Sequence, residues 1–244
     1  MNLIADTHTH TLASTHAYCT LMEMVHAAAQ KKLFAIAITD HGATMPGAPG
    51  RWYFRNLKVL PREMEGVLIL RGEETNVTDF EGGTDLNAED LPSLDWVVAS
   101  IHEVTMRDKA PTVEKVTDAW LQIAENPSVR VIGHSGSEQY RYDYEKVLPV
   151  FAKNGKLVEL NESTFKGRSR SVPNCTKIMK LCKKYGVPII VNSDAHFSTQ
   201  VGCFPRSMQL LEEIGFPEEL IVNSSVDRFC AYLRRYTGVF SNSN

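Results

Sequence analysis

The chain has 244 residues, of which 43% are hydrophobic and 23% charged, as is typical of a folded globular protein. Its formal net charge of −3 gives no electrostatic basis for nucleic acid as the main partner. No stretch approaches the roughly 18 apolar residues of a membrane-spanning helix. We therefore expect one globular domain over residues 1–244 that has no membrane-embedded part.

The cysteines argue against a disulfide framework. They are five in number, widely spaced and without a CxxC pair, at Cys19, Cys175, Cys182, Cys203 and Cys230. The apolar start of the chain, residues 1–6, is too short for the hydrophobic region of a signal peptide. We expect a cytoplasmic protein with reduced thiols, and the sequence leaves its oligomeric state open.

Apolar runs alternate with loops and helical patterns along the chain. Seven runs are strand-like, at residues 3–8, 34–41, 67–75, 95–102, 129–134, 156–163 and 187–196. Several are nearly continuous in Val, Ile, Leu and Ala, which is expected of parallel strands buried on both faces. The short run at 220–222 is a weak candidate for an eighth strand.

Helical patterns lie between many of these runs. A capping-box sequence at residues 20–23 predicts a helix that continues to about residue 32. Residues 111–125 have apolar positions at helical spacing, and a further helix is predicted from an Asn174 cap to a C-terminal Gly186. Strands that alternate with helices indicate a parallel sheet with right-handed crossovers.

Polar side chains gather where the seven predicted strands end. These residues are His8 and His10, His41, Glu73 and Glu74, His102, His134, Glu159 with Asn161 and Glu162, and Asp194 with His196. In an open sheet the edge strands would end too far apart to share one small site. In a barrel all carboxyl ends of the strands converge on one face, so the pattern predicts an α/β barrel.

Nine residues at this face form a candidate metal site: His8, His10, His16, His41, Glu74, His102, His134, Asp194 and His196. Imidazole and carboxylate ligands suit zinc, manganese or iron. At about three protein ligands per catalytic ion, nine ligands predict about three ions. Three divalent ions, two carboxylates and one hydroxide leave a charge of about +3, which favours a phosphate group that bridges metals. The remaining histidine, His26, is interpreted as an ordinary helix residue.

Two loops on the same face carry further candidates. Lys166, Arg168 and Arg170 follow the sixth predicted strand and are candidates for binding phosphate, although a solvated basic loop is an equal alternative. The loop at 42–58 contains Arg51-Trp52-Tyr53, which is either a rim that selects the leaving group or a segment packed on the barrel. Asp6 and Asp40 either orient metal-binding histidines or simply end their strands.

The motifs His8-x-His10, His16, Asp40-His41-Gly42, Gly72-x-Glu74, His102, His134 and Asp194-x-His196 closely resemble the PHP (polymerase and histidinol phosphatase) family. The segments HTHTLASTHAY, LRGEE and NSDAH are most similar to its stand-alone YcdX-type phosphatases. The resemblance implies a distorted seven-stranded, TIM-like β/α barrel, the PHP fold, with a trinuclear centre that usually holds zinc.

The resemblance also implies a ligand assignment. One ion is held by His8, His10, Glu74 and Asp194, a second by His16, His41 and His196, and a third by Glu74, His102 and His134. Glu74 bridges two ions and is preferred to Glu73 because the family spacing is G-x-E.

The sequence therefore predicts a metal-dependent phosphatase for small phosphate monoesters, with Glu74 and Asp194 as catalytic residues. A metal-activated hydroxide would attack phosphorus in line with the departing alcohol oxygen. Histidinol phosphatase and phosphodiesterase or nuclease activities are the alternatives within the family. Outside it, a two-metal amidohydrolase would leave His16 and His196 without a role, and a non-catalytic metal-binding scaffold would not need the complete ligand set.

Overall fold

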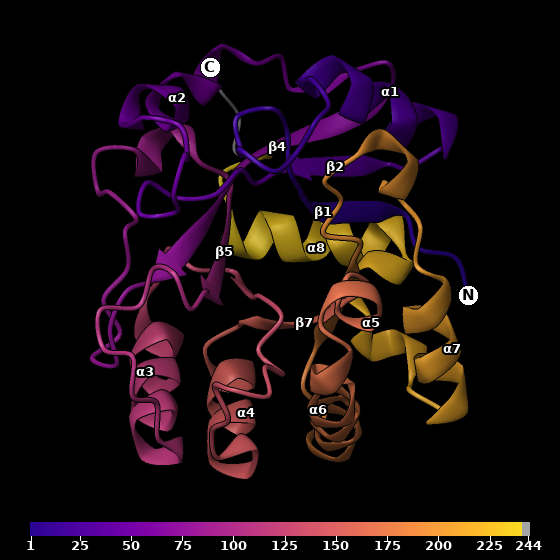
Figure 1. The fold of residues 1–244 in the computed structure, drawn as a ribbon. Coiled ribbons are helices and arrows are strands. Elements are labelled where there is room, and N and C mark those ends of the chain that lie inside the picture. The colour runs from indigo at the N-terminus through magenta and orange to yellow at the C-terminus, as the bar shows by residue number, and fades with distance from the viewer. Residues whose placement is uncertain (241–244) are drawn as a thin grey trace.

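The computed structural model describes residues 1–240, in which seven parallel strands form a nearly closed barrel surrounded by helices (Figure 1). Neighbouring strands follow the order β1-β2-β4-β5-β6-β7-β8. These strands are β1 (Ala5–Thr9), β2 (Ala35–Ile38), β4 (Val67–Val77), β5 (Trp96–Ile101), β6 (Val131–Ile132), β7 (Leu157–Asn161) and β8 (Ile189–Asn192). Each coincides with one predicted apolar run, so the prediction of a distorted seven-stranded, TIM-like barrel is confirmed.

The seam between β1 and β8 is closed largely by asparagine side chains. The Asn192 Oδ1 atom accepts a hydrogen bond of 2.9 Å from the backbone N–H of Thr7. Lower in the seam, Asn223 Nδ2 donates to the carbonyls of Ala5 at 2.9 Å and Val191 at 2.7 Å. These amides pair backbone groups that a continuous ladder would otherwise pair. The carboxyl ends of β1 and β8 are therefore held side by side, which an open sheet would not allow.

The predicted helices are present, with one corrected boundary. Helix α1 (Leu21–Gln30) begins with the predicted capping box, and α3 (Val113–Glu125) begins after a Thr112 cap. Helix α6 (Val172–Tyr185) ends at Gly186, whose φ of 66° favours glycine. It begins after Ser171 and not at the predicted Asn174 cap, because a proline occupies its first turn, where the missing N–H costs nothing.

Several elements were not assigned a residue range from the sequence, although a helical tail was expected after the NSDAH segment. They are α2 (Arg51–Asn56), α4 (Tyr144–Lys153), α5 (Thr164–Gly167), α7 (Pro205–Glu213), α8 (Val226–Tyr236) and the short strand β3 (Glu63–Met64). The run at 220–222 forms no strand, although Ile221 makes a single bridge to Ile189. Within residues 1–240, no helix is both long enough and apolar enough to cross a bilayer.

Helix α8 packs across the amino-terminal end of the barrel (Figure 1). Its buried Phe229 and Leu233 belong to one apolar cluster with residues from the beginnings of the strands, among them Ala5, Trp96 and Leu157. This end of the barrel is therefore filled with hydrocarbon, and the polar residues lie at the opposite end.

Candidate metal centre

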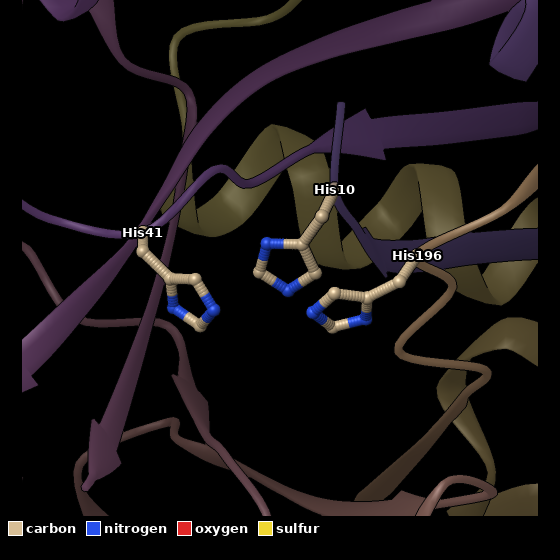
Figure 2. Close-up of side chains that lie close together, drawn as sticks. All are labelled: His10, His41 and His196. Atoms are coloured by element: carbon tan, nitrogen blue, oxygen red, sulfur yellow. The ribbon is translucent and has the colours of Figure 1, made fainter. Parts of the chain in front are cut away.

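The carboxyl end of the barrel brings all nine predicted ligands together. Every barrel strand except β7 carries at least one of them, either within the strand or in the segment that follows it. They are His8 in β1, His10 and His16 after it, His41 after β2, Glu74 in β4, His102 after β5, His134 after β6, and Asp194 and His196 after β8. Figure 2 shows the rings of His10, His41 and His196 converging from three different segments.

Glu74 lies at the centre of this cluster. Its Oε1 atom is 3.2 Å from His8 Nε2 and 3.0 Å from His134 Nε2, and its Oε2 atom is 2.7 Å from His41 Nδ1. Two residues earlier in β4, a Cβ atom on Gly72 would lie 2.7 Å from the carbonyl oxygen of Trp96. The glycine therefore lets β4 approach β5 closely, and strand alternation directs Glu74 into the barrel mouth.

Asp194 forms the second acidic group of the cluster. Its Oδ1 atom lies 3.3 Å from His10 Nε2, and its Oδ2 atom accepts a 2.8 Å bond from Arg168 Nη2. The backbone of Asp194 has a φ of 55°, and that of His134 has a φ of 25°. Non-glycine residues in this region are strained, and such strain concentrates at functional sites.

His16 and His196, which a two-metal site would not use, both join the cluster. The Nε2 atom of His16 is 3.2 Å from His41 Nε2. The ring of His196 stacks on those of His16 and His10, with centroid distances of 4.6 and 4.3 Å. These contacts place the loop histidine beside strand-end histidines rather than in solvent.

Neighbouring acceptors orient three of the rings through Nδ1. His8 Nδ1 is 2.7 Å from Glu159 Oε1, and His196 Nδ1 is 3.0 Å from the carbonyl oxygen of Asp194. His102 Nδ1 is 2.7 Å from the amide oxygen of Asn76, whose nitrogen donates to Asp85 at 2.7 Å. Because each acceptor faces Nδ1, the hydrogen of a neutral ring lies there and Nε2 keeps a free lone pair.

Several of the inward-facing atoms are buried and form no hydrogen bond of good geometry, although three of the nitrogens lie 2.7–3.3 Å from a carboxylate oxygen of Glu74 or Asp194. These buried atoms are the Nε2 atoms of His8, His10 and His196, Nδ1 of His41 and Oε2 of Glu74. Unpaired buried polar atoms are costly, and their concentration at one point indicates that another group binds them. Imidazole nitrogens and carboxylate oxygens are ligands of divalent transition metals, so this donor set fits metal ions.

Three sets of three residues each bring their ligand atoms within 4.8 Å of one another. They are His10 with His41 and His196, His8 with His10 and Asp194, and His41 with Glu74 and His102. The second group falls inside one of the sets implied by the family resemblance, whereas the other two each combine residues from two sets. Several ions thus have candidate positions, and their ligand sets overlap at His10 and His41.

The charges of the cluster are strongly coupled. Burial would raise the pKa of Glu74, but His8 and His41 hold that pKa well below its usual range. Burial also opposes ionisation of Asp194, yet His8, His10 and Arg168 hold its pKa well below the ordinary value. Burial lowers the pKa of His10 and His102 well below that of free imidazole. Burial opposes protonation of His8 and His41 as well, yet Glu159 and Glu74 raise the pKa of His8, and Glu74 raises that of His41. Metals bind ionised carboxylates and neutral imidazoles, so metal binding here would release protons from these two rings.

A cavity of about 470 Å³ opens over the cluster. Glu74, Asp194 and five of the histidines line it together with Arg168, while Met45, Val104 and Tyr140 form part of its wall. Of the three predicted substrate-binding residues, Arg168 therefore reaches the site. Arg170 lines an adjoining hollow of about 340 Å³ that also contacts Arg168, and Lys166 is exposed and lines neither.

The segment Arg51-Trp52-Tyr53 forms no rim of this cavity. Trp52 is 81% exposed, and Arg51 pairs with Glu89 at 3.1 Å. Tyr53 turns inward, and its hydroxyl lies 2.5 Å from Asp40 Oδ2. The residue of the 42–58 segment that does line the cavity is Met45.

Sequence reasoning did not assign a role to Glu159, which the structure places directly behind the ligands. Its Oε1 atom contacts His8, and its Oε2 atom accepts a 2.8 Å bond from the backbone N–H of His134. The sequence feature that could have indicated this role is the position of a carboxylate at the centre of a buried, mainly apolar strand. Asp6 does not orient a histidine, since it accepts bonds from Ser193 and from the backbone N–H of Gly202.

Comparisons with known proteins agree with this architecture. A protein from Acetivibrio thermocellus named "Probable phosphatase" is 44% identical over 235 residues, which are 96% of this chain and 97% of that protein. The crystal structure of histidinol phosphate phosphatase from Lactococcus lactis, complexed with zinc, L-histidinol and phosphate, has a TM-score of 0.62 at 17% identity. That similarity covers 89% of this chain and 95% of the Lactococcus chain.

A histidinol phosphatase structure from Listeria monocytogenes, described as putative, has a TM-score of 0.59 at 19% identity. It covers 83% of this chain and 99% of the Listeria chain. The family described as PHP-associated matches residues 173–205. The PHP domain family matches residues 6–163, which include seven of the nine candidate ligands. The chain therefore belongs to the PHP domain family.

Proposed function

We propose that this protein is a metal-dependent phosphatase that hydrolyses phosphate monoesters at a trinuclear metal centre. The observation that carries the proposal is the cluster of seven histidines around Glu74 and Asp194, in which several inward-facing nitrogens are buried and unpaired. Relatives of near-full length that are more than 40% identical bear the name "Probable phosphatase", which supports the same activity.

The proposed centre uses nine ligands in three sets. His8, His10, Glu74 and Asp194 would hold one ion, and His16, His41 and His196 a second. Glu74, His102 and His134 would hold the third, with Glu74 shared. Zinc fits this donor set, as manganese and iron also do, and the Lactococcus neighbour is complexed with zinc. Bound divalent ions supply Lewis acidity, which lowers the pKa of water and neutralises charge on phosphate oxygens.

The protein's own groups position the substrate. Arg168 lies at the cavity wall, where its Nη2 atom donates to Asp194 Oδ2 and to Asn161 Oδ1, so its Nη1 and Nε hydrogens are left for a phosphate oxygen. Its Nε atom is buried without a partner, which is consistent with a ligand at this position. Arg170 and Lys166 would add longer-range attraction for the anion from the same loop.

The cavity favours a small substrate. A volume of about 470 Å³ is at the lower end of the range for pockets that bind small molecules. Its wall at Val104 and Tyr140 offers apolar contacts for the alcohol part of a monoester, while Arg168 stands beside the metal ligands. A polynucleotide would require a longer basic surface, which the net charge of −3 does not favour.

A substrate panel tests the proposal. Protein loaded with zinc or with manganese is assayed on p-nitrophenyl phosphate, on bis-p-nitrophenyl phosphate and on a p-nitroanilide. We expect hydrolysis of the monoester, at least about 100-fold slower hydrolysis of the diester, and none of the amide. Profiling phosphorylated metabolites then identifies the natural ester.

The matched control is His26→Asn, because His26 lies on α1 and pairs with Glu65 at 2.9 Å, outside the cluster. This variant should retain full activity, whereas His10→Asn should lose it. Faster hydrolysis of the diester would favour a phosphodiesterase, and exclusive reaction with the amide an amidohydrolase. If the protein binds metal but hydrolyses none of the three chromogenic substrates and none of the phosphorylated metabolites, it would instead be a metal-binding scaffold.

A further inference from the structure

The buried carboxylate of Asp40 connects helix α2 to the metal cluster. Asp40 follows β2, is fully buried and accepts four hydrogen bonds. Its Oδ1 atom receives the backbone N–H of Thr11 at 2.7 Å and the hydroxyl of Ser14 at 2.8 Å. Its Oδ2 atom receives the hydroxyls of Thr11 at 2.8 Å and Tyr53 at 2.5 Å. A carboxylate can only accept, so the direction of all four bonds is fixed.

The hydrogen bond from Ser14 to Asp40 determines whether the Ser14 hydroxyl donates to or accepts from its other two neighbours, His41 and His10. A serine hydroxyl has a single hydrogen, and Ser14 donates it to Asp40. The same oxygen can therefore only accept hydrogen bonds from its two other neighbours. These are the backbone N–H of His41 and the Nδ1 atom of His10, each 3.2 Å away. His10 must then carry its hydrogen on Nδ1. Its buried Nε2 atom, which faces Asp194 Oδ1 at 3.3 Å without a hydrogen bond of good geometry, keeps the lone pair that a metal requires.

Tyr53 completes this arrangement from outside the barrel. It lies on α2, which Arg55 ties to Asp90 by a 2.9 Å ion pair. Burial and the nearby Asp40 carboxylate raise the pKa of Tyr53, so the phenol keeps its hydrogen and donates it. Without this hydroxyl, Asp40 Oδ2 would keep only the Thr11 hydroxyl, and the buried carboxylate would be held less firmly in the orientation that accepts from Ser14.

We propose that Tyr53 is a positioning residue for the metal centre, acting through Asp40 and Ser14 to hold His10 in the tautomer and orientation that bind metal. His10 belongs to two of the three groups of close ligand atoms, so its orientation bears on more than one ion. Groups that orient metal-binding histidines typically change metal affinity about 10- to 100-fold when removed. The inference deepens the proposed function, since it concerns the same centre, but it requires only metal binding.

The test compares Tyr53→Phe with Trp52→Phe, which changes the neighbouring, 81% exposed ring and no hydrogen bond of the Asp40 network. Zinc affinity is measured by competition with a metallochromic chelator, and unfolding of the metal-free proteins is measured in urea. We expect Tyr53→Phe to weaken at least one zinc site about 10- to 100-fold, and Trp52→Phe to bind as the wild type does. Ser14→Ala should weaken the same site.

Wild-type zinc affinity in Tyr53→Phe would overturn the proposal. The proposal would also be overturned if the free energy of zinc binding fell by no more than the free energy of unfolding of the metal-free protein, since Tyr53 would then have only a structural role. If Tyr53→Phe does not fold, nitrogen-15 NMR of the metal-free wild type decides: an Nδ1–H tautomer at His10 supports the proposal and an Nε2–H tautomer refutes it. A protein that shows the zinc effect but hydrolyses no phosphate ester would refute the phosphatase and leave this inference standing.

Discussion

The two ends of the barrel differ in how many of their buried polar side chains form hydrogen bonds. At the amino-terminal end, buried Lys156 donates to the carbonyl oxygens of Asn126 and Val129, and the Tyr232 hydroxyl donates to Gly155 at 2.7 Å. At the carboxyl end, nitrogens of His8, His10 and other ligands are equally buried but form no hydrogen bond of good geometry, although carboxylate oxygens of Glu74 and Asp194 lie 3.2 and 3.3 Å away.

The same strands supply both ends, so the difference arises from which residues begin and end each strand. Alanine, leucine and tryptophan begin the strands and meet α8, whereas histidines and acids end them. The amino-terminal end pairs the polar atoms of Lys156 and Tyr232, although the indole N–H of Trp96 has no partner there, and its apolar packing stabilises the fold. The carboxyl end leaves donor atoms unpaired, as a site does when its partner is an ion.

The largest effect is expected from changing the centre of the carboxyl end. Glu74→Gln removes the charge that lies within 3.2 Å of both His8 and His134. We expect kcat/KM for a phosphate monoester to fall by at least about 10³-fold, with a loss of bound zinc. Elemental analysis and steady-state kinetics measure both. Retention of full activity would show that Glu74 is no ligand.

The corresponding change at the amino-terminal end is Phe229→Ala. Phe229 is fully buried on α8 and packs near Trp96 with a ring-centroid distance of 6.1 Å. Its removal should lower the free energy of unfolding by about 3–5 kcal/mol, measured in urea. The folded fraction should keep its zinc content. A variant that lost zinc while remaining folded would contradict the separation of the two ends.

Arg168 offers a smaller change at the cavity wall. Arg168→Ala removes the guanidinium that contacts Asp194 at 2.8 Å and lines the cavity. We expect kcat/KM for the monoester to fall about 10- to 100-fold, mainly through a higher KM. Arg170→Ala and Lys166→Ala are the matched loop controls, and each should change KM by about threefold or less. Equal effects at all three positions would mean that the loop acts only through its net charge.

The smallest effect concerns the pH dependence of stability at the amino-terminal end. Burial lowers the pKa of Lys156 from 10.5 to about 8. Between these values the unfolded lysine holds a proton that the folded one has released, so stability rises with pH in this window. In urea unfolding at pH 8 and pH 10, the wild type should gain stability relative to Lys156→Met. A parallel change in both proteins would contradict this account.

The sequence was sufficient to predict the barrel because each strand contains both of its signals, an apolar run and a polar end. Gly72-x-Glu74 and His8-x-His10 lie within such strands, so their direction follows from alternation. The exact start of α6 was less predictable, because Ser171 and Asn174 are both acceptable caps and a proline in the first turn favours the earlier one.

The groups behind the ligands could not be predicted, because they come from distant parts of the chain. Glu159 reaches His8 across 151 residues, and Asn76 reaches His102 across 26. Tyr53 was interpreted as a rim or packing residue because no local pattern reveals its bond to Asp40. Such pairings depend on the closed barrel and become visible only in three dimensions.

The central claim is that the carboxyl end binds three metal ions and that the loop residue His16 belongs to one of them. Elemental analysis of zinc-loaded wild type, His16→Ala and His26→Ala after removal of free metal tests it most directly. The account predicts about three zinc ions per chain in the wild type and in His26→Ala, and about two in His16→Ala. Two or fewer zinc ions in the wild type, or an unchanged content in His16→Ala, would contradict it.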